Sequence, residues 1–354
     1  MKPFVIGISG INAVDNPGPG IGVARSLKED AALNARVIGL AYDAMEPGLY
    51  MDWVVDRSFI LPYPSGDGEA YFDRLSFIRK QAGLEFVIPN LDAELPLYIK
   101  NARLIEERGI RTFLPTMEQF KLRGKDRLGE VAGRIGVKLP KTKVVTSLDQ
   151  FCEAVEELGL PVMVKGSFYK AWAAYTTTQA IAHYHALVAE WGYPVIVQSI
   201  VTGDELNVIG VGDGEGKSLG AVGIKKISVT ALGKIWTGVT VKQRAMLEAA
   251  ERFTREFKWR GPFELECIVK GDDVFLIEIN PRFPAWVYFA TGVGVNLPSR
   301  LVRAALGEDL PPAPDYDAGK LFVRYSYELV TDMVKFQQAV TRGEVGMTHD
   351  AMPT

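Results

Sequence analysis

Cysteine is scarce in this chain. Only two cysteines occur among 354 residues, Cys152 and Cys267, and they lie far apart in the sequence. Neither belongs to a CxxC motif or to a Cys/His spacing that binds zinc, and two isolated thiols cannot build a disulfide framework. The sequence therefore indicates neither a zinc site nor a disulfide scaffold, and it suits a reducing compartment.

Long apolar runs and a strong excess of one charge are also lacking. No apolar stretch approaches the about 18 residues that span a bilayer, and the first residues are too few for the apolar region of a signal peptide. The chain has 40 basic and 43 acidic residues, so no overall field attracts nucleic acid or an anionic membrane. We expect a soluble cytoplasmic protein with neither of these partners.

Two common nucleotide-binding motifs are missing as well. The loop after the first apolar run contains Gly18, Gly20 and Gly22, whose spacing is not GxGxxG, and no P-loop consensus occurs anywhere in the chain. The sequence therefore does not favour an NAD site or a P-loop nucleotide site.

The first third of the chain alternates between strand-like and helix-like segments. Such alternation predicts a parallel sheet with helices on its faces, so residues 1–116 are expected to form a small doubly wound α/β domain. The predicted strands are residues 4–8, 36–40, 85–88 and 112–114, and the predicted helices are residues 21–27, 75–82 and 95–108.

Beyond residue 116 the pattern changes to an α+β unit with antiparallel strands. We expect a second unit over residues 117–310, with a smaller lobe at about residues 140–200. A proline-rich stretch at 311–315 reads as a linker, and residues 311–354 are expected to form a C-terminal extension.

Residues 263–280 predict a β-hairpin, because two strand-like runs flank the turn-like residues 270–273. Side chains alternate between the two faces of a strand, so one face is wholly apolar and the other is polar. The expected apolar face consists of Phe263, Leu265, Cys267, Val269, Phe275, Ile277 and Ile279. The expected polar face consists of Glu264, Glu266, Glu278 and Asn280.

The register of this hairpin predicts two opposed carboxylates. A three-residue loop pairs Lys270 with Val274, and counting outward then sets Glu266 opposite Glu278. Like charges in that position are destabilising unless a cation lies between them, and oxygen ligands suit Mg²⁺. The alternative is a solvated outer face whose acidic residues only aid solubility.

The run Glu278-Ile279-Asn280-Pro281-Arg282, with Glu266 twelve residues before Glu278, resembles the metal-binding signature of the ATP-grasp superfamily. The resemblance implies a two-lobed ATP-grasp fold that binds ATP and Mg²⁺, with Mn²⁺ as an alternative ion. It also implies that Glu266, Glu278 and Asn280 bind the metal, and that Arg282 acts on the transferred phosphoryl group or the substrate carboxylate.

The same resemblance implies a set of lysines around the phosphates. Lys165 ends the strand-like run 162–164 and is assigned both phosphate binding and a catalytic role, and Lys125 lies in a basic segment typical of the family. Lys170 is a further phosphate candidate, and one of the strand neighbours Lys225 and Lys226 faces the same side. For each lysine the alternative is a solvated position.

The adenosine site is implied by residues 195–205, where an apolar strand is followed by a short hinge. Gln198, Ile200 and Val201 are the adenine candidates, and Glu205 is the ribose candidate. The alternative for Glu205 is an exposed strand start.

The loop over residues 166–174 departs from the family pattern, which is usually rich in glycine and serine. Here Phe168, Tyr169 and Trp172 make it bulky, so it covers the substrate, binds a partner or packs internally. The first domain, including residues 87–95, resembles the pre-ATP-grasp domain of carbamoyl phosphate synthase-like proteins.

The activity implied by this resemblance is ADP-forming ligation. A substrate carboxylate becomes an acyl phosphate and an amine then forms an amide or peptide-like bond, so the expected partners are a small carboxylate and an amine or a peptide. The alternatives are bicarbonate activation, thioester formation, a non-catalytic nucleotide-binding subunit and a peptide-binding module. The sequence leaves the identity of the substrates and a homodimeric state open.

Overall fold

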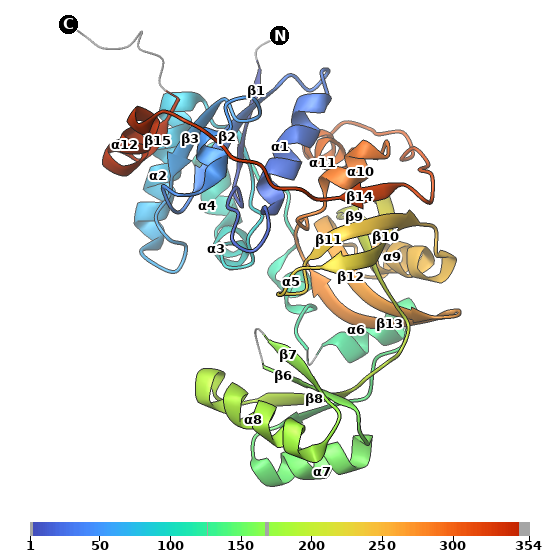
Figure 1. The fold of residues 1–354 in the computed structure, drawn as a ribbon. Coiled ribbons are helices and arrows are strands. Elements are labelled where there is room, and N and C mark those ends of the chain that lie inside the picture. Colours follow the sequence, from blue (N-terminus) through green and yellow to red (C-terminus); the bar gives the residue numbers. More distant parts are fainter. Residues whose placement is uncertain (1–2, 126, 167–169, 347–354) are drawn as a thin grey trace, which may run out of the picture.

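The computed structural model describes residues 3–125, 127–166 and 170–346, and three β-sheets organise them (Figure 1). A five-stranded sheet belongs to the first domain, a six-stranded sheet forms the middle of the molecule, and a four-stranded sheet forms a small lobe at the far end. This arrangement confirms the expected combination of a doubly wound α/β domain with antiparallel sheets.

The first domain is built on a mostly parallel sheet with the strand order β15-β3-β2-β1-β4. Its parallel strands are β1 (Phe4–Ile8), β2 (Ala35–Ala41), β3 (Arg57–Ile60) and β4 (Phe86–Ile88). Its helices are α1 (Pro19–Glu29), η1 (Pro47–Tyr50), α2 (Gly68–Ala82), α3 (Leu95–Lys100) and α4 (Ala102–Glu107). The chain runs from β1 outward to β3 and returns to β4 on the other side of β1. The loops after β1 and β4 therefore flank a topological switch point.

Two predicted elements of this domain differ from the structure. The helix predicted over 95–108 is two short helices separated by Asn101, whose side-chain amide donates to the Leu97 carbonyl oxygen at 2.8 Å. The strand predicted over 112–114 is absent from the described residues there, which make a single bridge between Arg111 and Phe86. Strand β3 was not predicted.

The six-stranded sheet is antiparallel and has the order β13-β12-β9-β10-β11-β14. Its strands are β9 (Asp204–Asp213), β10 (Ser218–Val229), β11 (Ile235–Val241), β12 (Arg260–Lys270), β13 (Asp273–Asn280) and β14 (Leu321–Val323). Its accompanying helices are α5 (Met117–Lys121), α6 (Leu128–Ile135), α9 (Arg244–Glu256), α10 (Tyr288–Gly292) and α11 (Leu297–Ala305). Phe253 of α9 packs against Trp259 and Phe263, which anchors the start of β12.

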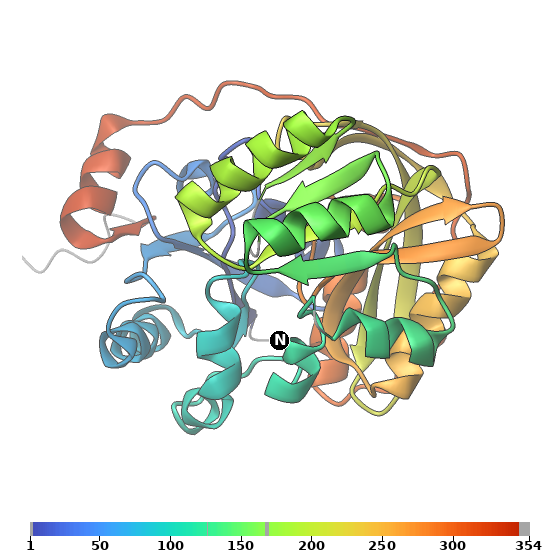
Figure 2. The ribbon, with the colours of Figure 1, turned by 90° about the horizontal axis from the view of Figure 1, so that it is seen from below.

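The small lobe is a four-stranded antiparallel sheet with two helices on its outer face (Figure 2). Its elements are β5 (Thr142–Val145), α7 (Leu148–Leu158), β6 (Val162–Lys165), β7 (Ala171–Ala174), α8 (Thr177–Trp191) and β8 (Val195–Ser199). Ser147 and Thr176 cap the two helices by accepting hydrogen bonds from Gln150 N and Gln179 N. The lobe has a hydrophobic core of its own.

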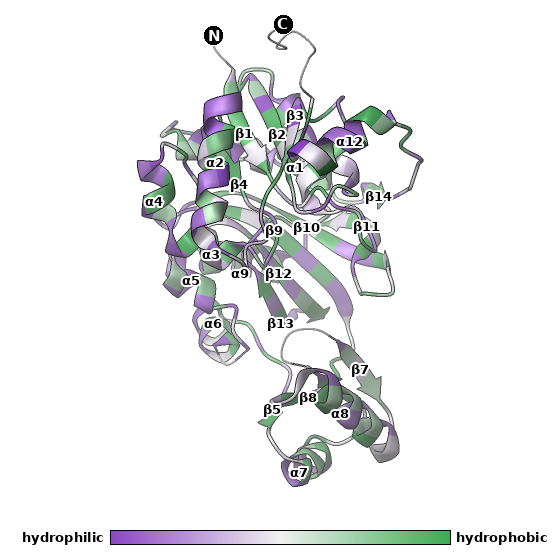
Figure 3. Ribbon diagram, turned by 90° about the vertical axis from the view of Figure 1, so that its left-hand side faces the viewer, coloured by the Kyte–Doolittle hydropathy of each residue, from purple (hydrophilic) through white to green (hydrophobic). Residues whose placement is uncertain are grey.

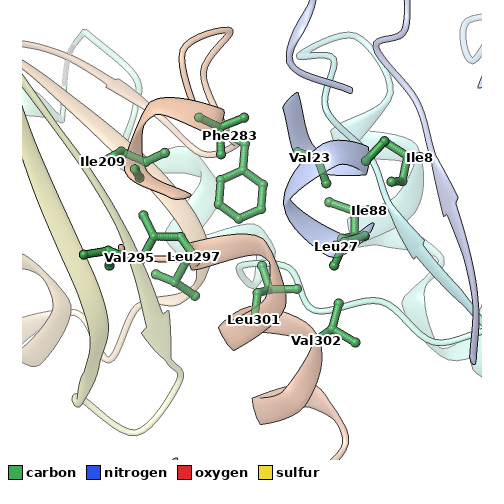
Figure 4. Close-up of a cluster of buried hydrophobic side chains, with 14 of the residues drawn as sticks. Ile8, Val23, Leu27, Ile88, Ile209, Phe283, Val295, Leu297, Leu301 and Val302 are labelled. Carbon is green, nitrogen blue, oxygen red and sulfur yellow. The ribbon is translucent and has the colours of Figure 1, made fainter. Parts of the chain in front are cut away.

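One hydrophobic core joins the first domain to the six-stranded sheet (Figure 4). Val23 and Leu27 of α1 face Leu301 of α11, and Phe283 lies between them and the sheet. Because these side chains are fully buried, the first domain is fixed against the sheet that carries the hairpin.

The C-terminal segment returns to the first domain. Strand β14 pairs with β11, and helix α12 (Met333–Arg342) then leads to β15 (Glu344–Val345), which pairs with β3. In its described part, the segment beyond residue 310 therefore adds one strand to each of two sheets.

The helices within the described ranges all lack the combination of length and apolar character that crossing a lipid bilayer requires.

Hydrophilic stretches of the six-stranded sheet lie on the side that faces the small lobe (Figure 3). Glu266 of the hairpin lines one cavity together with Lys165 and Gln198 of the small lobe, so this polar side chain lies between the two antiparallel sheets.

Candidate active site

The β12–β13 hairpin differs from the predicted one in its turn. Lys270 pairs with Asp273 across the two residues Gly271 and Asp272, so the predicted three-residue loop and the Lys270–Val274 pair are wrong. Gly271 has φ +62°, a conformation that glycine adopts without steric cost.

A β-bulge restores the predicted pairing further along the hairpin. Cys267 pairs with Leu276, but Glu266 pairs with Glu278, so Ile277 is an extra residue. Glu266 therefore lies opposite Glu278, and Glu264 lies opposite Asn280, as the sequence predicted.

The two-residue turn also changes which side chains of β13 enter the core. Val274 and Leu276 are buried, whereas Phe275 and Ile277 are only half-buried. The predicted apolar face is therefore wrong at Phe275 and Ile277, because the two-residue turn reverses the alternation of β13 up to the bulge.

Glu264 is the most enclosed carboxylate of the polar face. Its Oε1 accepts hydrogen bonds from Asn207 Nδ2 at 2.6 Å and Trp286 Nε1 at 2.7 Å, and its Oε2 accepts one from Asn280 Nδ2 at 3.1 Å. Burial and the neighbouring Glu266 raise the pKa of Glu264 to about 7. The bond from Asn280 fixes the Asn280 amide group, so the role of Glu264 is to orient Asn280 at the centre of the site.

Glu266 and Glu278 form the open part of the acidic cluster. The Glu278 side chain reaches solvent. Partial burial of its carboxyl group nevertheless raises its pKa, and the charges of Glu266 and Asp92 raise this pKa further. Glu266 accepts a hydrogen bond from Lys226 Nζ at 2.9 Å and from Asn280 Nδ2 at 3.1 Å. Glu278 thus lies opposite Glu266 at a point where the protein disfavours the charge of Glu278.

This donor set fits a divalent cation. Mg²⁺ is usually bound by one or two carboxylates together with water and substrate phosphate, which is what opposed Glu266 and Glu278 can supply. No cluster of three or more His, Cys, Asp or Glu side chains suited to a metal occurs among the described residues. Asn280 is the third side chain with an oxygen at the site, and its amide Oδ1 accepts a hydrogen bond from Arg282 Nη2 at 3.4 Å.

Arg282 is held beside this cluster by the first domain. Its Nε donates to Asp92 Oδ2 at 2.7 Å, while Arg123 Nη1 donates to Asp92 Oδ1 at 2.5 Å. Burial opposes both charges, but the two guanidinium groups lower the pKa of Asp92, and Asp92 raises that of Arg282. The sequence pattern assigns no role to Asp92 or Arg123, although residues 87–95 carry part of the resemblance to a pre-ATP-grasp domain.

A cavity of about 250 Å³ lies between the small lobe and the hairpin. Five predicted nucleotide-binding residues line it together with Glu266, namely Lys165, Gln198, Ile200, Val201 and Glu205. The structure therefore brings residues from β6, β8, β9 and β12 to one place.

The two predicted phosphate lysines meet at the small-lobe side of the site. Lys165 Nζ donates to Gln198 Oε1 at 2.6 Å, and Lys125 Nζ donates to the Gly166 carbonyl oxygen at 2.6 Å. Burial lowers the pKa of both ammonium groups, and Lys125 lowers that of Lys165 further. A polyanion between them would relieve this repulsion.

Lys226 lies in the same cavity and resolves the choice between the two strand lysines. It contacts Glu266 and lies 3.6 Å from Glu205 Oε2, whereas Lys225 pairs with Asp204 at 2.7 Å outside the cavity lining. Burial opposes its charge, but Glu266 and its acidic neighbours raise the pKa of Lys226 overall.

Lys170 is not brought to the cavity. It forms an ion pair with Glu190 of α8 at 2.5 Å and lies 5.7 Å from the Trp172 ring. Trp172 packs against His183 with ring centroids 5.2 Å apart, which favours the packing interpretation for this side chain. The predictions for Phe168 and Tyr169 lie outside the described residues.

Comparison with known proteins agrees with this geometry. Residues 193–327 match the family model described as ATP-grasp in the biosynthetic pathway with Ter operon. That match contains the hinge, Glu205, Lys226 and the hairpin, but not the first domain.

Solved structures of the same fold cover most of the chain. An N5-carboxyaminoimidazole ribonucleotide synthetase solved as its ADP complex is 15% identical, with a TM-score of 0.68, over 91% of this chain and 81% of that one. The biotin carboxylase domain of Hydrogenobacter thermophilus 2-oxoglutarate carboxylase, solved as a dimer with MgADP, ADP and bicarbonate, is 19% identical, with a TM-score of 0.64, over 86% and 70%. Biotin carboxylase from Campylobacter jejuni is 18% identical, with a TM-score of 0.65, over 87% and 72%. These similarities establish the fold.

Proposed function

We propose that this chain is an ATP- and Mg²⁺-dependent ligase of the ATP-grasp type that activates a carboxylate as an acyl phosphate for attack by an amine. The family match of residues 193–327 and the similar fold of an N5-carboxyaminoimidazole ribonucleotide synthetase support this proposal. The observation that carries the proposal is the opposition of Glu266 and Glu278 beside a cavity lined by Lys165, Gln198 and Glu205. Fold alone does not decide an activity, so the proposal rests on these side chains.

The nucleotide occupies the cavity between the two antiparallel sheets. Adenine binds at Gln198, Ile200 and Val201, and Glu205 accepts hydrogen bonds from the ribose hydroxyls. Lys165 and Lys125 bind the phosphates, whose negative charge relieves the repulsion between the two lysines.

Glu266, Glu278 and Asn280 would hold the divalent ion, which would supply charge neutralisation on the phosphate oxygens. Occupation of this site removes the repulsion between the two opposed carboxylates. Mn²⁺ has the same preference for oxygen ligands.

Arg282 and Lys165 stabilise the charge that develops during transfer. The substrate carboxylate attacks the γ-phosphorus, the bond to the ADP oxygen breaks, and an acyl phosphate forms. The amine then attacks the acyl carbon and inorganic phosphate leaves. Arg282 is preorganised for this task because Asp92 fixes its guanidinium group before substrate binds.

Bicarbonate is the second candidate for the activated acid. The Hydrogenobacter structure of the same fold was solved with bicarbonate, and bicarbonate presents the same attacking carboxylate oxygen. We further propose that the protein acts in the cytoplasm on small molecules, and that it is a homodimer like that neighbour.

The proposal is tested by ADP release. ATP, Mg²⁺ and the protein are incubated with panels of amino acids, small carboxylates or bicarbonate, each with and without a panel of amines. Stimulation of ADP and phosphate release by one acid and amine pair is expected. Nucleotide binding without stimulation by any pair would favour a non-catalytic nucleotide-binding subunit.

Glu278→Gln should lower turnover at least about a hundredfold while the protein stays folded, because it removes one metal charge from a solvent-accessible position. Asp272→Asn is the matched control, since Asp272 is an exposed acid in the turn of the same hairpin. Equal turnover in both variants would contradict the metal assignment.

A further inference from the structure

Arg123 is a cation beside the proposed active site that has no role in the function proposed above. Lys125 and Lys165 serve the nucleotide phosphates there, and Arg282 serves the transferred phosphoryl group. Within the described part of the chain, the lining of the nucleotide cavity includes Lys165 and Lys226 but not Arg123. The charge of Arg123 is therefore left for another anion.

The main chain around Arg123 is held in place by its neighbours. Helix α5, which precedes it, begins with a capping box in which Thr116 and Gln119 exchange hydrogen bonds, and Gln119 Nε2 also donates to the Lys258 carbonyl oxygen at 2.6 Å. Leu122 is buried in the core that α6 and α9 share with the six-stranded sheet. A side chain on such a fixed main chain loses less conformational freedom when it binds a ligand.

The side chain of Arg123 shares Asp92 with Arg282. Arg123 Nη1 donates to Asp92 Oδ1 at 2.5 Å, and Arg282 Nε donates to Asp92 Oδ2 at 2.7 Å. Because each guanidinium group uses a different oxygen, the two arginines flank one carboxylate, and Asp92 compensates only one of their two positive charges. They thus present two separate cationic groups, which suit two anionic groups better than one.

Arg123 also keeps most of its hydrogen-bonding capacity. A guanidinium group carries several N–H donors, and among the described residues the Arg123 side chain donates a single hydrogen bond, to Asp92. The Arg123 side chain is 32% exposed, against 20% for Arg282. The Phe120 ring supports it, with the ring centroid 5.1 Å from the guanidinium carbon. An anion can therefore reach the unused donors from solvent.

Arg123 lies within electrostatic range of the metal-binding face of the hairpin. It is joined through Asp92 to Arg282, whose Nη2 donates to Asn280 Oδ1 at 3.4 Å. Burial is the main cause that raises the pKa of Glu278, and the charges of Arg282 and Arg123 oppose this rise. A small molecule that meets Arg282 can therefore also meet Arg123.

The first domain offers an acid no comparable site. A cavity of about 430 Å³ adjoins Asp92, because both chain neighbours of Asp92 line it. Its lining carries the acidic residues Asp43, Glu46 and Glu94, and neither lysine nor arginine within the described ranges. This lining repels an anion, so an acid is favoured at Arg123 instead.

Resting on the proposed function, we propose that the acid substrate is a dicarboxylic acid, whose first carboxylate is phosphorylated beside Arg282 and whose second carboxylate is bound by Arg123. An arginine and a carboxylate match each other in bidentate geometry, so Arg123 selects a second carboxylate over a neutral group. Bicarbonate has no second carboxylate and is the less suited of the two candidate acids.

The test measures binding of stable analogues of the phosphorylated acid to the complex of the full chain with MgADP. 3-Phosphonopropionate and 4-phosphonobutyrate carry a phosphonate and a carboxylate, butylphosphonate lacks the carboxylate, and phosphonoacetate resembles phosphorylated bicarbonate. In isothermal titration, 3-phosphonopropionate or 4-phosphonobutyrate should bind at least about tenfold more tightly than butylphosphonate, as one added charged hydrogen-bonded pair predicts.

Arg123→Met should remove this preference and leave the affinity for butylphosphonate within about twofold, whereas Arg123→Lys should retain part of the preference. Arg127→Met is the matched control, because Arg127 lies in the same segment and its side chain pairs with Glu130 at 2.7 Å. This control should leave both affinities unchanged. An equal loss of affinity for both kinds of probe in Arg123→Met would show that Arg123 only supports Asp92, and would overturn the proposal.

The comparison of probes on the unaltered chain keeps the test decisive if Arg123→Met fails to fold. Equal affinities for butylphosphonate and the two longer phosphonocarboxylates would overturn the proposal, as would a preference confined to phosphonoacetate. Either result together with ADP release would reject the second carboxylate alone. Tight binding of a longer phosphonocarboxylate without ADP release from any pair of dicarboxylic acid and amine would instead reject the ligase function.

Discussion

The carboxylates that define this protein occupy surroundings that penalise their charge. Glu266 and Glu278 oppose each other across two strands, and Glu46 is buried with one oxygen unpartnered among the described residues. Lys226 pairs with Glu266, whereas burial raises the pKa of both Glu278 and Glu46 and so disfavours their charged forms. Unfavourable pairing of this kind is found at functional sites more often than in structural positions.

At the residue scale, Glu46 should make stability depend on pH. The pKa of its carboxyl group has the ordinary value of 4.5 in the unfolded chain, and burial raises it to about 7 in the folded one. The folded state therefore favours the protonated acid, and this contribution is fully present below about pH 4.5 and lost as the pH rises through about 7. Glu46→Gln should stabilise the first domain by up to about 3 kcal/mol at pH 8 and by little at pH 4.5.

Native-state hydrogen exchange of the β1 and β2 amides would measure this difference, because it reports opening of the first domain by itself. Glu153→Gln, at an exposed acid on α7, is the control and should show no such pH-dependent gain. A gain of the same size at both pH values would show that ionisation of Glu46 is not its cause.

At the element scale, the bulge in β13 reconciles a two-residue turn with the pairing of Glu266 and Glu278. If Ile277 were absent, Glu278 would directly follow Leu276. Because Leu276 pairs with Cys267, Glu278 would then pair with Glu266 without a bulge. Deleting Ile277 should therefore keep Mg²⁺-dependent ATP binding. Deleting Ile279 should abolish it, because Asn280 would then lie opposite Leu265 and point into the core.

Titration of ATP with and without Mg²⁺ would compare the two deletion variants. Retention of the Mg²⁺ effect in the Ile277 deletion but not in the Ile279 deletion would confirm that register, rather than strand length, positions the ligands. Equal loss in both would show that the bulge geometry itself is required.

At the scale of the whole molecule, the C-terminal segment links the middle sheet to the first domain. Arg57 of β3 and Glu344 of β15 form an ion pair at 2.8 Å with side chains only 10% and 11% exposed. Glu344→Ala should cost about 2 to 3 kcal/mol of unfolding free energy, because it leaves a nearly buried guanidinium group unpaired.

Glu107→Ala is the matched control in the same domain, since its partner Arg103 is 93% exposed and such pairs contribute little. Urea unfolding of both variants would make the comparison. Similar small losses would indicate that strand pairing alone attaches the C-terminal segment.

The sequence predicted the elements whose signals are local. The alternation of strands and helices identified the doubly wound domain, and the run from Glu278 to Arg282 located the hairpin and its acidic face. The predicted helix over 95–108 was broken at Asn101, because a side-chain bond to Leu97 competes with helix continuation. Strand β3 was missed, since it is short and its burial depends on neighbouring strands.

By itself, the sequence determined the fold class, the opposed carboxylates and most of the cavity-lining nucleotide candidates, because residue spacing and strand alternation carry that information. Only the tertiary structure decided that Lys226 joins the site, that Lys170 pairs with Glu190 instead, and that Asp92 fixes Arg282. It also revealed the acidic cavity around Glu46. These features depend on contacts between residues distant in the chain, and such contacts follow from packing rather than from local pattern.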